Sequence, residues 1–89
     1  MSVSHLVVAP TSEHKSAAEK IERLKAEARS LAYEHLEALN DALTEVAQLA
    51  REICDGGDLY PVGALELARR LKEDVGRQAL SLSAIIARN

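Results

Sequence analysis

The chain has 89 residues, of which 47% are hydrophobic, and only Tyr33 and Tyr60 are aromatic, so the apolar content is mostly Leu, Ala, Ile and Val. This composition favours helices over a β-sandwich, and a chain of this length forms one domain at most. The net charge of -3 is made of scattered acids and bases, which argues against a basic nucleic-acid surface, and the single cysteine, Cys54, excludes an internal disulfide.

The first eleven residues lack the signals of a stable helix. Their apolar stretch is too short to span a membrane and has no positive flank of the kind found in signal peptides. Pro10 has no backbone N–H to donate to a helix. We therefore predict a flexible N-terminal arm over residues 1–11 and a cytoplasmic protein.

The first helix is predicted over residues 12–54. No glycine or proline lies between Thr11 and Asp55, and Thr11 or Ser12 offers a side-chain oxygen that can cap the N-terminus. Apolar residues recur at steps of three and four, which is the pattern of a helix with one buried stripe, and Leu31, Ala42 and Leu49 widen it. The stripe consists of Ala17, Ile21, Leu24, Ala28, Ala32, Leu36, Leu39, Leu43, Val46, Ala50 and Ile53.

The sequence Asp55-Gly-Gly-Asp58 predicts the turn that ends this helix. Glycine adopts the left-handed conformation of a helix C-cap at little cost, and Asp58 is expected to cap the next helix, with Pro61 in its first turn. We predict this second helix over residues 59–87. Its apolar stripe consists of Ala64, Ala68, Leu71, Val75, Ala79, Leu82 and Ile86.

A short connection between two helices makes them antiparallel neighbours, so that facing residues have numbers adding up to about 115, and Leu39 is expected beside Val75. Two helices do not enclose a core. The fold class is therefore predicted as an all-α, long antiparallel helical hairpin, formed by residues 12–89, that dimerises into a four-helix bundle about a two-fold axis. The expected core and dimer interface consists of Ile21, Leu24, Leu31, Leu36, Leu39, Leu43, Val46, Ile53, Leu71, Val75, Leu82 and Ile86.

No pattern of catalytic or metal-binding residues stands out. His35, midway along the first helix and preceded by Glu34, resembles the histidine of phosphotransfer and histidine-kinase dimerisation domains, but the proline and the basic residue or glycine that usually follow are absent. Cys54 is interpreted as a small buried thiol. Without a Glu-x-x-His motif or a glycine-rich phosphate loop, we predict no enzyme activity, no cofactor and no bound metal.

Residues 64–86 resemble a bacterial helix-turn-helix, because Leu67-Ala-Arg-Arg-Leu71 is followed by Val75-Gly76. The segment between Leu71 and Val75 is two residues longer than in that motif, and the apolar stripe keeps its helical spacing on both sides of Gly76.

The predicted function is a protein–protein interaction module that acts as a homodimer, as a regulator or adaptor. Its expected partners are a second copy and possibly another helical protein, with neither nucleic acid nor a membrane expected. The alternatives are a DNA-binding regulator and a phosphorelay hairpin that uses His35.

Overall fold

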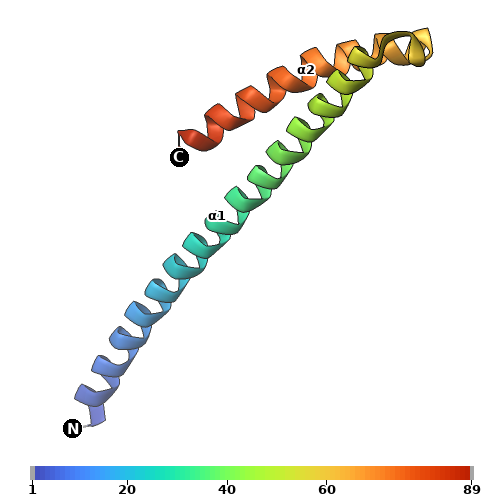
Figure 1. Cartoon of the computed structure of the whole chain (residues 1–89). Coiled ribbons are helices and arrows are strands. Elements are labelled where there is room, and N and C mark those ends of the chain that lie inside the picture. The colour runs from blue at the N-terminus through green and yellow to red at the C-terminus, as the bar shows by residue number, and fades with distance from the viewer. Residues whose placement is uncertain (1, 89) are drawn as a thin grey trace. The chain divides into compact units, whose positions relative to one another are not determined.

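The computed structural model describes the backbone of residues 2–88 and the side chains of residues 16–88. Helix α1 spans Ser2–Gly56, a 3-10 helix η1 spans Gly57–Leu59, and helix α2 spans Val62–Ala87, with no strand in this described part (Figure 1). The chain divides into two compact units, residues 1–32 and residues 33–89, and the second unit contains the turn and all of α2. The predicted all-α helical hairpin is confirmed.

Helix α1 begins earlier than the sequence predicted. It was expected to begin at residue 12, but the structure places its first residue at Ser2. A proline inside a helix removes one backbone hydrogen bond at a cost of about 3 kcal/mol, and the sequence argument treated Pro10 as a stop for that reason. The loss of one bond does not prevent the neighbouring residues from keeping helical backbone angles. Thr11 and Ser12 lie inside α1 and not at its first residue, and their side chains are outside the described residues. The flexibility of residues 1–11 stays a prediction.

Both glycines of the turn are explained by the structure. Gly57 has a φ of 57°, in the left-handed region that costs other residues conformational energy. Gly56 lies against the ring of Tyr60, and a Cβ atom at this position would collide with that ring. The Tyr60 N–H donates to the Gly57 carbonyl oxygen at 3.1 Å and closes the turn. The prediction of a glycine-dependent end of α1 is therefore correct.

The start of α2 was predicted three residues too early. Pro61, with φ -59° and ψ 148°, is the N-cap residue, and its carbonyl oxygen accepts a bond of 3.0 Å from the Leu65 N–H. Asp58 lies in η1 and makes no cap to α2, which contradicts the expected role of that side chain. Proline suits this boundary because its fixed φ is compatible with the residue that precedes a helix and the missing N–H is not needed there.

Alanines form the contact between α1 and α2. Every buried residue in the described part of the chain is an alanine, namely Ala47 and Ala50 on α1 and Ala68 and Ala79 on α2. Half-buried residues continue the contact along both helices at steps of three and four, which is the spacing of an antiparallel coiled coil. These half-buried positions are Tyr33, Leu36, Asn40, Leu43 and Cys54 on α1, and Leu65, Lys72, Val75, Leu82 and Ile86 on α2.

The hydrogen bond between the two helices joins residues that the expected register did not pair. Asn40 Nδ2 donates to Ser83 Oγ at 2.8 Å, whereas the predicted register placed residue 40 beside Val75. The turn contains η1 and two further residues, so its centre lies nearer to Leu59 than the Gly56-Gly57 pair suggested. Helical side chains also lean toward the N-terminus of their own helix, which moves the Asn40 amide further from the turn and the Ser83 hydroxyl toward it.

Candidate interaction surface

Two grooves of different chemistry flank the alanine contact between α1 and α2. We call the first the apolar groove. It has a volume of about 250 Å³, and every side chain that lines it is apolar. The lining residues are Val46, Leu49, Ala50 and Ile53 from α1, and Ala64, Leu67, Ala68 and Leu71 from α2.

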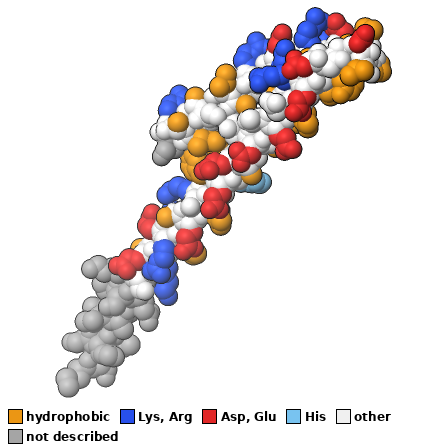
Figure 2. Space-filling model, in the orientation of Figure 1, with side chains coloured by type: hydrophobic (Ala, Val, Ile, Leu, Met, Phe, Trp, Pro, Cys, Tyr) orange, Lys and Arg blue, Asp and Glu red, His pale blue; other side chains and the backbone are white. Residues whose placement is uncertain are grey.

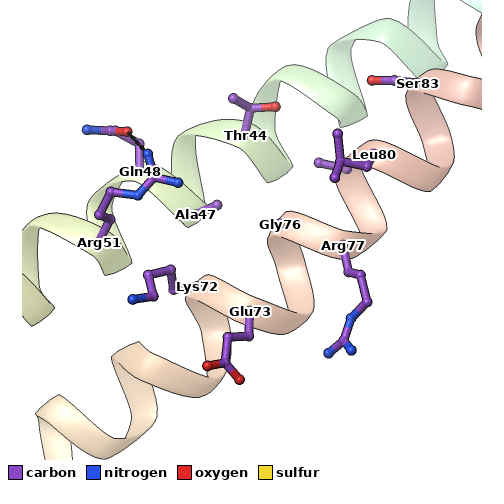
Figure 3. Close-up of a pocket in the computed structure, with 11 residues that line it drawn as sticks. Thr44, Ala47, Gln48, Arg51, Lys72, Glu73, Gly76, Arg77, Leu80 and Ser83 are labelled. Atoms are coloured by element: carbon purple, nitrogen blue, oxygen red, sulfur yellow. Dashed lines mark hydrogen bonds between the residues drawn. The ribbon is translucent and has the colours of Figure 1, made fainter.

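The second groove, which we call the polar groove, has a volume of about 470 Å³ and lies along Thr44 to Arg51 of α1 and Lys72 to Ser83 of α2. Figure 3 shows Arg51 and Lys72 coming from the two helices at one level of this groove, while Arg77 points away from α1. Arg51 Nη1 donates to Gln48 Oε1 at 3.4 Å. Arg77 is bound by Asp74 at 2.7 Å. The polar groove therefore combines charged side chains with apolar ones such as Leu80, whereas the apolar groove has no charged lining residue.

The acidic side chains of α1 in the second unit follow the polar side of the hairpin. A helix turns by 100° per residue, and this rotation places the acids on the side of α1 that faces away from α2, with Glu45 next to Leu49. Figure 2 shows one face of the molecule, on which charged side chains spread along both helices and hydrophobic ones gather near the turn. The acids are Glu34, Glu37, Asp41, Glu45, Glu52 and Asp55. We call the side of the hairpin that carries Val46, Leu49 and the apolar groove its apolar side.

Four of the nine large hydrophobic residues that are exposed in the described part of the second unit lie on the apolar side, and Leu59, Tyr60 and Val62 lie at the turn. Leu49 is 52% exposed and Leu67 is 57% exposed, and both line the apolar groove. Val46 is one turn further from the hairpin turn than Leu49, and Leu39 lies on the same face of α1 further along. Leu80, at 73% exposed, is the comparable residue on the polar groove. Contiguous apolar exposure of this kind is typical of a binding surface.

The first unit is described over residues 16–32, and every side chain in this range is exposed. Ile21 is 51% exposed, Leu24 is 62% exposed and Leu31 is 65% exposed. An ion pair of 3.6 Å joins Lys25 to Glu22. These residues belong to successive turns of α1 and form a single apolar face with charged residues on both sides of it. No described residue covers this face.

The residues predicted for the core and dimer interface fall into two groups. Seven are half-buried within the hairpin: Leu36, Leu43, Ile53, Leu71, Val75, Leu82 and Ile86. Five are exposed: Ile21, Leu24, Leu31, Leu39 and Val46. The sequence analysis did not single out Ala47 and Asn40, although both belong to the contact with α2. Alanine is small and asparagine is polar, so neither residue stands out in a pattern of large apolar side chains.

The candidate reactive residues are isolated. His35 is exposed on α1, one turn from Leu31 and one turn from Leu39, so it lies within an apolar face and not beside a group that would orient it. Cys54 is a free, half-buried thiol near the turn. Within residues 16–88, no three His, Cys, Asp or Glu side chains come close enough to hold a metal ion.

Helix α2 is continuous through the segment that resembles a helix-turn-helix. It runs from Val62 to Ala87 without a break, and Gly76 lies in its interior with an ordinary negative φ. The two crossed helices that the DNA-binding motif requires are therefore missing from residues 62–87. No helix of the described chain has an apolar stretch long enough to cross a membrane.

Comparison of the chain with protein families, with curated protein sequences and with solved structures finds no match in any of the three.

Proposed function

We propose that this chain is a cytoplasmic protein–protein interaction module that acts as a homodimer, as a regulator or adaptor. The observation that carries the proposal is that small apolar side chains are buried between the helices whereas large ones are exposed. Alanines are buried between the helices, while leucines such as Leu49 and Leu67 line an open groove. A hairpin that is complete by itself would place its large apolar residues inside.

The energetics favour association for the same reason. Burial of apolar surface stabilises a fold by about 25 cal/mol per Å², and four alanines contribute little of it. A single hairpin of this size is thus marginally stable, and a second molecule that covers the apolar groove supplies the missing burial. A four-helix arrangement of two hairpins related by a two-fold axis is a common solution to this problem.

Sedimentation equilibrium of the full chain over a range of concentrations tests the proposal. We expect a monomer–dimer equilibrium that shifts toward monomer when Leu49→Glu places a charge in the apolar groove, because an unpaired buried charge is strongly unfavourable. Leu80→Glu is the matched control, since Leu80 is exposed on the polar groove. A chain that stays monomeric at millimolar concentration contradicts the proposal, and so does equal weakening by the two variants.

A further inference from the structure

One apolar stripe of α1 has the period of a straight α-helix from Ala17 to Ile53. Ile53 lies 36 positions after Ala17 and is reached in ten steps, so the mean spacing is 3.6, the number of residues per helical turn. The stripe therefore stays on one helix face, and its two consecutive four-residue steps meet at His35. Its members are Ala17, Ile21, Leu24, Ala28, Leu31, His35, Leu39, Ala42, Val46, Leu49 and Ile53, and all but Ile53 are exposed.

The stripe is symmetric about His35. In each direction from His35 the steps are four, three, four, three and four residues. A two-fold axis at this residue would align two antiparallel copies of α1 so that each stripe position of one copy meets a stripe position of the other. The pairs formed in this way are Leu31 with Leu39, Ala28 with Ala42, Leu24 with Val46, Ile21 with Leu49, and Ala17 with Ile53.

We propose that residues 17–24 of a second copy fill the apolar groove, with the two α1 helices antiparallel and His35 at the two-fold axis. Each end of the dimer is then a three-helix bundle of α1 and α2 from one copy and the N-terminal part of α1 from the other. This arrangement replaces the four-helix bundle, because the two α2 helices lie at opposite ends of the dimer. This inference rests on the proposed homodimer and specifies which segment occupies the groove.

The segment and the groove agree in length and in side-chain size. Val46 to Ile53 and Ala17 to Leu24 both cover eight residues, which is about 12 Å of helix. Ile21 meets Leu49 near the middle of the groove, and the small Ala17 meets the larger Ile53 near the turn. Such alternation of large and small side chains allows helices to pack closely.

Charges along the edge of the groove also agree with this orientation. The second copy's segment runs antiparallel to α1 and hence parallel to α2, so residue numbers rise in the same direction along the segment and α2. Glu22 then comes to Arg70, and Lys25 comes to Asp74. To form these contacts, Lys25 must leave Glu22 and Asp74 must leave Arg77. Both existing pairs are exposed, so breaking them costs little free energy.

The opposite edge is mixed. There, Arg23 lies near Glu45, which is favourable, and Glu27 lies near Asp41, which is unfavourable. Both pairs are at the solvent-exposed rim, where a single charge pair has a small effect. The apolar pairs and the pairs on the α2 edge therefore determine the orientation.

Cross-linking of single-cysteine variants, made in a Cys54→Ser chain, tests the arrangement. His35→Cys is expected to form a disulfide-linked dimer on mild oxidation, because a residue on the axis meets its own copy. Leu49→Cys alone is expected to remain uncross-linked, whereas an equimolar mixture of Ile21→Cys and Leu49→Cys is expected to give the mixed dimer. A self-linked Leu49→Cys dimer would instead show two grooves facing each other and overturn the inference, as would a dimer in which His35→Cys does not cross-link.

A second measurement does not depend on disulfide geometry. Ile21→Glu is expected to weaken the dimer at least tenfold in sedimentation equilibrium, although Ile21 lies outside the hairpin unit. Ala26→Glu is the matched control, because Ala26 is exposed on the opposite side of the same segment. Loss of dimer in Leu49→Glu but not in Ile21→Glu would leave the homodimer in place and refute its proposed occupant. A wild-type chain that never dimerises would refute the homodimer itself.

Discussion

Replacing Ala50 by leucine is expected to destabilise the hairpin because there is no room for the added carbons between the helices. Ala50 is 3% exposed, and Ala68 across the contact is 4% exposed. Helices that touch through alanines lie at the short end of the 8–10 Å range of interaxial distances, so three extra carbon atoms force them apart or into strained rotamers. Overpacking of this kind costs about 1–3 kcal/mol.

For a chain of this size, 1 kcal/mol changes the melting temperature by about 4–8 °C, so Ala50→Leu is expected to melt about 5–20 °C below the wild type. Circular dichroism at 222 nm measures the transition at a fixed protein concentration. Ala84→Leu is the control, because Ala84 is exposed on α2 and the same substitution there changes stability by less than about 0.5 kcal/mol. Equal melting of Ala50→Leu and wild type would refute the close alanine contact.

Three further substitutions, with Gly63→Ala for comparison, test the turn, the polar contact and the continuity of α2 by thermal unfolding. Gly57→Ala is expected to lose about 1–2 kcal/mol because φ is 57°, while Gly63→Ala, in open space within α2, gains up to about 1 kcal/mol; a neutral Gly57→Ala would contradict the left-handed turn. Asn40→Leu removes the bond to Ser83 and also an amide oxygen that is buried without a partner, so we expect about 1 kcal/mol of added stability, and a loss would show that the polar pair is stabilising. Gly76→Ala is expected to add about 0.5–1 kcal/mol in a continuous helix, whereas a helix-turn-helix with its turn at this glycine would be destabilised.

Much of the fold follows from local sequence signals. A long stretch without glycine or proline predicts a long helix, and Gly56-Gly57 predicts its end, because only glycine fits beside Tyr60 and at a positive φ. The register and the start of α2 were harder to predict. They depend on how η1 and the extended Pro61 lengthen the turn, and a two-residue difference there moves every contact between the helices.

The orientation of α1 about its own axis was predicted only in part. The sequence argument directed the large residues Leu39 and Val46 toward the core, yet both are exposed, and Ala47 is buried in their place. Periodicity identifies a wide apolar surface but does not decide which edge of it meets the neighbouring helix. That choice was made by residue size, since two helices in close contact accept alanine and exclude leucine.

The alanine contact and the open apolar groove are two consequences of one arrangement. When two helices approach closely, their large side chains are displaced from the contact line to its flanks, where they form the walls of a groove. On the polar flank, long charged side chains such as Arg51 and Lys72 occupy those positions, and side chains of this kind can keep their charged groups in water. On the apolar flank, Leu49 and Leu67 occupy them, and no residue of the hairpin unit is left to cover them. A third helix with its own apolar face would complete the packing, and α1 carries such a face at Ile21 and Leu24, which is the reason for proposing a second copy as the partner.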